Sequence, residues 1–331
     1  MLWRHWWNLV CQLRPACSRG RTFLWMMTAL AGMTVRTDLL GVTSIVRALG
    51  LRSIYYDRLL DLFHSAALDL DTLTRTWRHL VFKAHPGILR VEGRPVLVGD
   101  GIKVAKAGRK MPAVKKLHQQ SESNTKPEYI FGHSCQAVAV LTQALLSVFA
   151  IPLTCRIHEG VVFSNRDKRT LLDKMILLID SLGIPEPFYF VADAYYGTGR
   201  IIRGLLAQGN HLVTRVKSNA VAWYPAPPPP PPGASRRRGR PRKYGNKIKV
   251  SLLLKKVDRL QEAASPIYGE KDVTIQWAVA DLLWRPVGTL IRFVAVIHPH
   301  RGVILLMSTD LNLAPLEIVR IYGLRFKIEG A

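Results

Sequence analysis

The first 90 residues carry apolar side chains at intervals of three and four positions. This spacing runs through residues 38–51 and 53–84 with few β-branched runs, and it is typical of helices that bury one face. Gly50 and the pair Pro86-Gly87 interrupt the pattern. We therefore predict an all-α N-terminal unit of several short helices over residues 1–92.

From residue 95 the pattern shortens to β-branched, mostly apolar runs, which are typical of strands. The predicted order is three strands (95–104, 132–142 and 144–157), a helix (167–184), a strand (188–196), a helix (197–210) and a strand (211–218). Strands and helices in this order predict a mixed α/β sheet with flanking helices over residues 93–220.

A run of prolines followed by basic residues interrupts the pattern at 224–249. Proline fixes φ and supplies no amide donor, and the neighbouring positive charges repel one another, so we predict a surface loop here. Three more strands follow (272–284, 289–299 and 302–311), and a last helix over 314–329 has Pro315 in its first turn. We assign 221–300 to a mostly β insertion and 301–331 to the return of the chain to the core.

The composition is that of a folded, strongly basic protein. The chain has 331 residues, of which 48% are hydrophobic, enough for a core. Its 47 Lys and Arg outnumber 23 Asp and Glu, which gives a net charge of +24 and indicates a polyanionic partner, most often nucleic acid. A membrane surface and ribosomal RNA are the rivals.

The cysteines and the N-terminal segment indicate in which cellular compartment the protein is found. Four cysteines without a CxxC pair argue against a zinc site or a disulfide framework and fit a reducing cytosol. The longest uncharged N-terminal run, Thr22 to Val35, is shorter than the roughly 20 residues that span a bilayer. We expect a cytoplasmic protein that does not bind a membrane.

Two aspartates stand at the carboxyl ends of predicted apolar strands. Asp100 ends the strand that begins at residue 95, and Asp193 lies near the end of the strand 188–196. Sites of α/β sheets form at such strand ends, and an unpaired carboxylate beside apolar surface is costly. A divalent cation such as Mg²⁺, or an Arg or Lys partner, would offset that cost. The alternative is structural: Asp100, between Gly99 and Gly101, stabilises a turn, and Asp193 caps a helix.

A third acid is placed by helical spacing. Tyr322, Arg325 and Glu329 fall on one face of the last predicted helix. The opposite face is apolar and is expected to pack on the sheet: Ile318, Ile321, Leu324 and Ile328. A solvated face with an Arg-to-Glu pair is the alternative. Asp310 and Glu317 compete for the role of third acid, but they lie outside the Tyr/Arg face.

Several segments together resemble the DDE transposases encoded by bacterial insertion sequences. The likeness lies in 97–134 (around Asp100), 190–206 and 211–223 (around Asp193), 239–245 and 305–329. The Tyr-x2-Arg-x3-Glu element of residues 322–329 is similar to the signature of the cut-and-paste branch of that family. The resemblance implies a ribonuclease-H-like catalytic core whose third acid comes from a late helix, after a β insertion.

The resemblance also implies a chemistry and roles for the site residues. Two Mg²⁺ ions, or Mn²⁺, about 4 Å apart would stabilise the attacking and leaving oxygens of phosphodiester cleavage and strand transfer. Asp100 would bridge the metals, and Asp193 and Glu329 would each complete the shell of one ion. Arg325 would contact phosphate, and Tyr322 would hydrogen-bond near the scissile strand.

Basic residues gather in three places that could follow DNA. The expected contacts are Lys103, Lys106, Arg109, Lys110, Lys115 and Lys116 in a loop after the first acid, Arg215 and Lys217 on the strand 211–218 that follows the second acid, and Arg238, Arg240, Arg242 and Lys243 in the sequence RRRGRPRK. Lysines and arginines that follow a backbone neutralise its phosphates. The alternative for the first group is a solubilising surface loop.

Taken together, these features favour a metal-dependent DNA transposase that acts on terminal inverted repeats and target DNA, as a homodimer, in the bacterial cytoplasm near the nucleoid. One rival is an inactive relative that only binds DNA, since the resemblance leads us to expect more chain after Glu329 and weak activity if the chain is truncated there. Another is a basic RNA- or ribosome-associated protein. The histidines, among them His158, His298 and His300, form no HxxxH or HExxH and favour core or loop roles.

Overall fold

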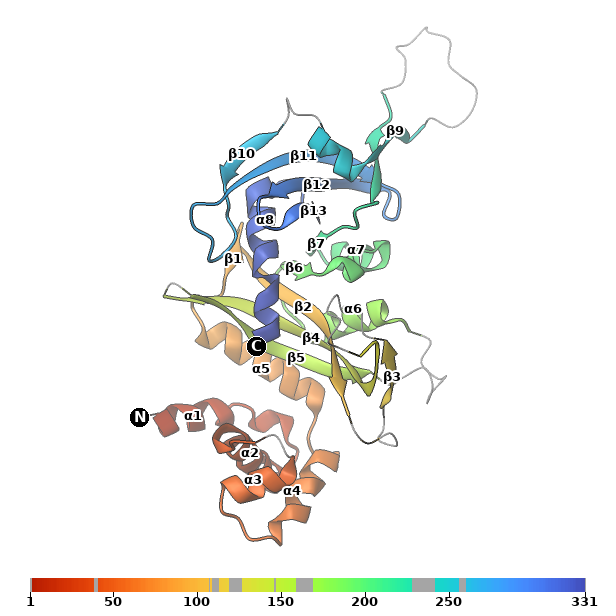
Figure 1. Cartoon of the computed structure of the whole chain (residues 1–331). Coiled ribbons are helices and arrows are strands. Elements are labelled where there is room, and N and C mark those ends of the chain that lie inside the picture. Colours follow the sequence, from red (N-terminus) through yellow and green to blue (C-terminus); the bar gives the residue numbers. More distant parts are fainter. Residues whose placement is uncertain are drawn as a thin grey trace. The chain divides into compact units, whose positions relative to one another are not determined.

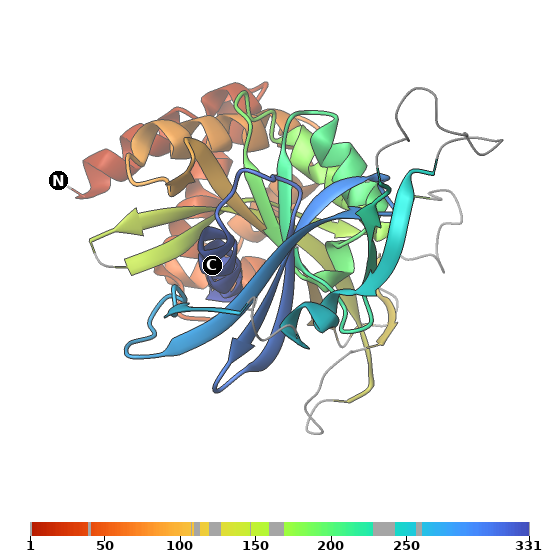
Figure 2. The same ribbon diagram turned by 90° about the horizontal axis from the view of Figure 1, so that it is seen from above.

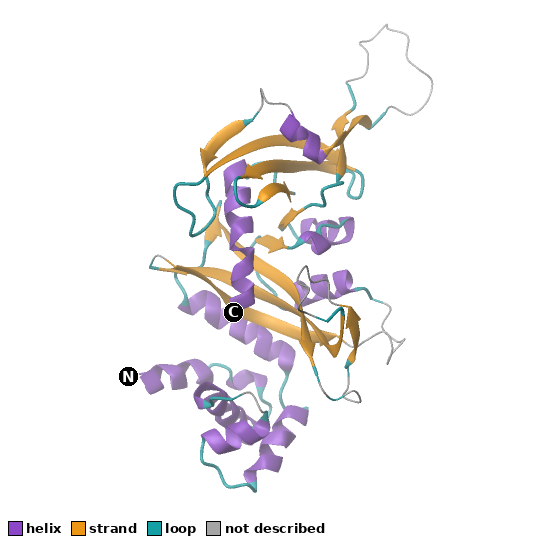
Figure 3. Ribbon diagram, viewed as in Figure 1, coloured by secondary structure: helices purple, strands orange, loops and turns teal. Residues whose placement is uncertain are grey.

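The computed structural model describes the chain except residues 1, 39–40, 107, 109–112, 119–126, 146, 159–168, 228–241, 256–259 and 331. It divides into two compact units. The first comprises Met1–Pro86 with Ser181–Gly183, and the second comprises Gly87–Asp180 and Ile184–Ala331. Figure 3 shows the contrast between them, because helices make up the N-terminal unit and strands dominate the second. No helix among the described residues is long and apolar enough to cross a membrane.

The first unit is built from short helices around one apolar cluster (Figure 1). Its elements are α1 (Leu2–Cys11), η1 (Arg14–Ala16), α2 (Gly20–Val35), α3 (Val42–Ala48), α4 (Tyr55–His64) and α5 (Leu70–Ala84). Ile45 and Leu59 are fully buried in the cluster. A Cβ at Gly32 would lie 2.4 Å from the Ile45 side chain, so this glycine allows α2 and α3 to approach closely. Asp69 caps α5 by accepting a hydrogen bond from the Thr72 amide.

The second unit is organised around one large mixed sheet. Its strands are β1 (Arg90–Val91), β2 (Arg94–Ala105), β3 (Lys115–His118), β4 (Tyr129–Ala144), β5 (Ser147–His158), β6 (Tyr189–Ala192), β7 (His211–Arg215), β8 (Val221–Pro225), β9 (Tyr244–Lys249), β10 (Gln261–Ala264), β11 (Thr274–Trp284), β12 (Thr289–His298) and β13 (Gly302–Ser308). The main path runs β3-β4-β2-β6-β7-β13-β12-β11-β8-β9, and β5 pairs with β4. Figure 2 shows the twist of these strands.

The centre of the sheet is parallel, whereas both arms are antiparallel. β2, β6 and β7 run parallel, with Val98 opposite Val191 and Val191 opposite Val213. β13 pairs antiparallel with β7 and thereby joins the β11–β13 arm to the core. The mixed sheet with flanking helices, together with the all-α unit, confirms the predicted α/β fold class and is consistent with a ribonuclease-H-like core.

The helices of the second unit cover the sheet in two groups. α6 (Leu171–Ser181) and α7 (Gly199–Leu206) lie side by side, and Gly204 of α7 makes room for Ile176 of α6. α8 (Pro315–Gly323) and η5 (Leu324–Gly330) form the C-terminal element, while η2 (Ala194–Tyr196) and η3 (Val250–Lys255) are single short turns. The predicted apolar side of the C-terminal element is confirmed, because these residues are buried in the main core cluster: Ile318, Ile321, Leu324 and Ile328.

The structure corrects three predictions of local structure. The single helix predicted over 314–329 changes after Gly323 from α to the tighter 3₁₀ form, which is frequent at helix ends. Part of the segment after Asp100 that was predicted as a loop is strand, in β2 and β3. The end of the predicted proline–basic loop is also strand, because residues 244–249 form β9.

Candidate active site

Asp100 stands where β2 leaves the core. Residues 95–99 of the strand are buried, Asp100 is partly buried, and residues 101–105 are exposed. The strand stays paired through this point, with Asp100 opposite Ala137 of β4, so the alternative that Asp100 stabilises a turn is wrong. The preceding glycine has a packing reason instead. A Cβ at Gly99 would lie 2.3 Å from the ring of Phe190.

Asp193 lies beside Asp100 at the end of the neighbouring parallel strand. Val98 pairs with Val191 in register, and each aspartate follows two residues later on its own strand. Adjacent strands are about 4.8 Å apart, so the two carboxylates share one edge of the core. Burial raises the pKa of Asp193, the charge of Asp100 raises it further, and Arg325 opposes both effects. The two carboxylates therefore repel each other at a site where a cation would be stabilising.

Local hydrogen bonds orient both carboxylates. Oδ1 of Asp193 accepts from the Tyr195 amide at 3.1 Å, and Oδ1 of Asp100 accepts from the Gly101 amide at 2.7 Å. The Thr214 hydroxyl donates to the backbone oxygen of Asp193 at 2.7 Å. Asp193 caps a short 3₁₀ turn and remains in the pair with Asp100. The structural alternative, that Asp193 caps the next helix, is wrong, because Thr198 caps α7.

Arg325 reaches the aspartate pair from the C-terminal element. Its Nη1 donates to Oδ2 of Asp100 at 3.2 Å, and its Nη2 lies 4.0 Å from Oε1 of Glu329. The side chain is 10% exposed, and its buried Nε has no hydrogen-bond partner among the described residues. The guanidinium also lies 4.2 Å from the ring centre of Phe326. Arg325 therefore brings a positive charge between the carboxylates of Asp100 and Glu329.

Glu329 is the most exposed of the three predicted acids, with a side-chain exposure of 59%. Among the described residues, no three His, Cys, Asp or Glu side chains are close enough together to hold a metal ion. The structure brings together Asp100, Asp193 and Arg325, and it leaves Glu329 on the far side of the guanidinium. Asp100 and Asp193 nonetheless supply the hard oxygen donors that Mg²⁺ prefers.

Tyr322 borders a small pocket next to these groups. The pocket has a volume of about 120 Å³, and Arg215, Arg301 and Phe326 line it with Tyr322. Burial raises the pKa of Tyr322, and the charges of Arg325 and Arg215 oppose that rise. The structure thus places Arg215, predicted as a DNA contact, beside Tyr322. Arg301 and Phe326 were not predicted, because nothing in their spacing linked them to the acids.

Tyr196 and Gln136 form a buried support that was not predicted from the sequence. Gln136 donates from Nε2 to the Tyr196 hydroxyl at 2.9 Å and to the Leu171 carbonyl at 3.0 Å. Burial raises the pKa of Tyr196, and the charges of Asp100 and Asp193 raise it further. The polar Gln136 in the otherwise apolar centre of β4 was the signal that could have identified this pair.

The competing acids lie elsewhere. Asp310 accepts a hydrogen bond at 2.6 Å from Tyr189, the first residue of β6, whereas Asp193 follows the last residue of that strand. At about 3.3 Å per residue, the two aspartates are separated by the length of β6. Glu317 pairs with Arg320 at 2.8 Å. His298, the last residue of β12, is buried and contacts Glu270 at 2.9 Å, a core role of the kind expected for the histidines.

The predicted DNA contacts fall on several elements. Lys103 lies in β2 and donates to the His118 carbonyl, Lys115 and Lys116 lie in β3, and Lys116 stacks on Tyr129 at 4.4 Å. These lysines therefore belong largely to strands and not to one loop. Exposed to solvent are Lys106, Arg215, Lys217, Arg242 and Lys243. Outside the described residues lie Arg109, Lys110, Arg238 and Arg240.

Comparison with known proteins places the chain in a family. The model of the DDE superfamily endonucleases matches residues 12–285, which include Asp100 and Asp193 and end before α8. A search of curated proteins finds no match. The matched region covers most of the chain, and both aspartates within it lie together at the edge of the sheet. The chain belongs to the DDE superfamily of endonucleases.

Proposed function

We propose that this DDE superfamily endonuclease is a DNA transposase that cleaves and joins DNA at the ends of an insertion sequence. The observation that carries the proposal is the pairing of Asp100 and Asp193 on adjacent parallel strands, with Arg325 at 3.2 Å from Asp100. Arg325 comes from the element with the Tyr-x2-Arg-x3-Glu spacing, more than 200 residues away in the chain. Endonuclease activity on DNA follows from the family, and transposition is the finer proposal.

Each residue has a distinct part in this chemistry. Asp100, Asp193 and Glu329 would hold the divalent cations, Mg²⁺ or Mn²⁺, which stabilise charge on the attacking and leaving oxygens when bound. The repulsion between Asp100 and Asp193 favours cation binding at the pair. Arg325 supplies a guanidinium suited to a phosphate oxygen. The Tyr322 hydroxyl is protonated at neutral pH, burial raises its pKa still further, and it would donate a hydrogen bond to the DNA strand.

The expected DNA substrates are the terminal inverted repeats of the element and its target. The net charge of +24 supports long-range attraction to such a polyanion. Arg215, the last residue of β7, and Lys217 just after it are exposed. β7 lies beside β6, the strand that Asp193 follows. A homodimer would bring two ends together for joining.

Alanine is less informative than an isosteric change for testing the metal site. Asp100→Asn and Asp193→Asn keep the shape and remove the charge, so we expect Mg²⁺-dependent nicking of supercoiled DNA to fall to background while DNA binding persists. Asp272→Asn is the matched control, because Asp272 is an exposed loop acid whose positive φ asparagine tolerates well. Nicking by either active-site variant at the parent rate would refute the assignment.

A transposase must also join DNA, so a second assay uses duplexes that carry the inverted repeats of the element. The expected products are strand-transfer products with new 3′ junctions in a target plasmid. If the protein cleaved DNA duplexes but joined none, its endonuclease activity would stand and the proposal that it is a transposase would be refuted.

An inactive, DNA-binding relative is the second candidate. Two observations favour it: the Arg325 guanidinium is paired with the Asp100 carboxylate, and the Glu329 side chain is exposed. A parent protein that binds DNA but does not nick it with either Mg²⁺ or Mn²⁺ would support this candidate over the first.

A further inference from the structure

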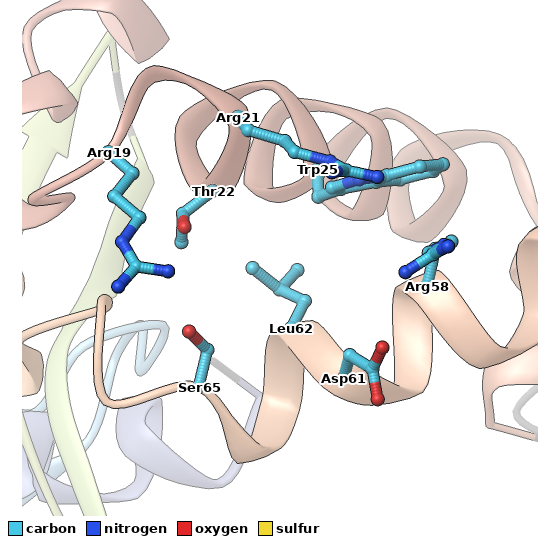
Figure 4. Close-up of a pocket in the computed structure, with 8 residues that line it drawn as sticks. All are labelled: Arg19, Arg21, Thr22, Trp25, Arg58, Asp61, Leu62 and Ser65. Atoms are coloured by element: carbon cyan, nitrogen blue, oxygen red, sulfur yellow. The ribbon is translucent and has the colours of Figure 1, made fainter.

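A small arginine-lined pocket lies between α2 and α4 in the N-terminal unit, separate from the aspartate pair. Figure 4 shows its lining residues: Arg19, Arg21, Thr22, Trp25, Arg58, Asp61, Leu62 and Ser65. In this view the guanidinium groups of Arg19 and Arg58 come from opposite ends of the pocket, with Leu62 between them. Three arginines and one carboxylate give the lining a net positive charge.

The three arginines are available to a ligand. All are exposed, and among the described residues no ion pair joins Arg19, Arg21 or Arg58 to an acid. Other arginines of this unit do have such partners, for example Arg47 with Asp38 at 4.0 Å. Arg19 and Arg58 face the pocket from opposite ends, and like charges around one pocket repel one another, so an anion bound in the pocket is stabilised.

The size of the pocket limits what it can hold. Its volume is about 130 Å³, room for only a few water molecules at roughly 30 Å³ each. Pockets for whole small molecules are larger, about 300–1,000 Å³. An anion of the size of one phosphate group therefore fits, and the rest of the ligand must remain outside.

The surroundings favour a nucleic-acid phosphate over other anions. Trp25 lines the pocket and lies against Tyr55, with ring centres 5.7 Å apart, so it offers a partly exposed aromatic surface beside the arginines. Residues 1–86 contain eleven basic residues against five acids, and ten of the eleven are arginine. Arginine is the residue of choice for phosphate contacts, and an adjacent aromatic ring suits a sugar or base.

We propose that this pocket binds a backbone phosphate of duplex DNA, with Arg19, Arg21 and Arg58 as its ligands. The phosphate site follows from the pocket itself, whereas the choice of DNA rests on the proposed function. The pocket adds a place of DNA binding outside the catalytic unit, and binding there holds the substrate without taking part in cleavage.

The test compares two charge-matched double variants of the full chain. Arg19→Gln/Arg58→Gln removes two pocket arginines, and Arg4→Gln/Arg75→Gln removes two exposed arginines of the same unit outside the pocket. Binding to a short duplex of arbitrary sequence is measured over a range of salt concentrations. Each phosphate that the protein no longer neutralises reduces the magnitude of the negative slope of log K against log salt by about 0.9. The pocket variant is expected to bind at least about tenfold more weakly at low salt, with a slope reduced by about 1 to 2, while the control keeps the parent slope.

Three outcomes overturn the proposal: a parent-like slope for the pocket variant, equal losses of affinity in both variants, or tighter binding of a duplex RNA of the same length by the parent protein. Circular dichroism and thermal unfolding confirm that both variants fold. The salt comparison needs no nicking readout, so a failed nicking assay refutes the proposed function without affecting this inference.

Discussion

At the residue scale, Arg325 places its positive charge beside the carboxylates of the candidate active site. Its guanidinium contacts Asp100 and approaches Glu329, and it opposes the upward shift that burial and Asp100 impose on the pKa of Asp193. A metal ion bound by the aspartates would perform the same neutralisation. Arg325 and the metal therefore compete for Asp100, and a phosphate oxygen is the natural next partner for the released guanidinium.

The competition predicts an unusual metal response in Arg325→Gln. Removing the guanidinium leaves the paired carboxylates without their counter-charge, so the metal-free variant should be less stable than the parent by about 1 to 3 kcal/mol. Mg²⁺ should restore more stability to the variant than to the parent, measured as the rise in thermal midpoint between chelator and excess Mg²⁺. Arg320→Gln, which breaks the Arg320–Glu317 pair on α8, is the control and should show the parent response. Equal rises in all three proteins would contradict the competition.

Gly99 links core packing to the position of Asp100. Alanine at this position would place a Cβ 2.3 Å from the Phe190 ring, and such overpacking costs about 1 to 3 kcal/mol. We expect Gly99→Ala to lower both stability and nicking, because β2 must shift at the residue before the aspartate. The double variant Gly99→Ala/Phe190→Leu makes room for the methyl group and should recover part of both. An unaffected Gly99→Ala, assayed by denaturant unfolding and nicking, would show that Phe190 moves aside freely.

At the element scale, the two ends of β6 lie next to carboxylates whose pKa values shift in opposite directions. Asp193 at one end has a raised pKa and pairs with Asp100 in the candidate active site. At the other end, burial alone would raise the pKa of Asp310, but hydrogen bonds from Tyr189 and the Asn312 amide, with the charges of His211 and Arg94, hold it below its usual range. One short buried strand thus separates a candidate catalytic acid from a structural one.

Tyr189→Phe tests the structural role of Asp310. Because the folded-state pKa of Asp310 is lowered, its stabilising effect is present above the unfolded pKa of about 4 and is lost as the pH falls through the folded value. The variant should lose about 1.5 to 3 kcal/mol of unfolding free energy at neutral pH, and the difference from the parent should narrow in acid. Denaturant unfolding at several pH values measures this difference. Tyr195→Phe, at a half-exposed tyrosine, should change little, and a pH-independent loss in Tyr189→Phe would argue for packing alone.

Much of this architecture could be predicted because apolar runs bounded by glycine and proline mark buried strands. The runs around Val98 and Val191 predicted β2 and β6, and their terminal aspartates predicted the edge of the sheet. β3 and β9 were not predicted, since their lysine-rich residues are held by backbone pairing with a neighbour rather than by burial of a side-chain face. Tertiary contacts such as Gln136–Tyr196 also leave little trace in local spacing.

At the scale of the whole molecule, positive charge comes from several segments of the chain. The N-terminal unit carries the arginine pocket, the second unit carries Arg215 and Lys217 beside its sheet, and the proline–basic segment adds a dense basic run. Phosphate contacts made at separate places contribute separately to the salt dependence of DNA binding. Affinity for DNA can therefore be weakened stepwise without touching the aspartates.

The proline–basic segment offers the clearest case of a removable contribution. β8 and β9 pair antiparallel from Val221↔Lys249 to Pro225↔Tyr244, and the Ala226 amide donates to the Lys243 carbonyl at 3.3 Å, so the chain ends that flank residues 228–241 already meet. Replacing 228–241 by a short Gly-Ser turn should leave the thermal midpoint near that of the parent, because shortening the connection between two paired strands changes closure entropy only slightly. The same deletion removes Arg236, Arg237, Arg238 and Arg240, and the slope of log K against log salt should fall by about 0.9 for each DNA phosphate that these arginines neutralise in the parent. A matched replacement that changes the arginines among residues 236–240 to glutamine at full loop length should reproduce this slope. If the deletion alone weakened binding, the length of the segment would matter rather than its charge.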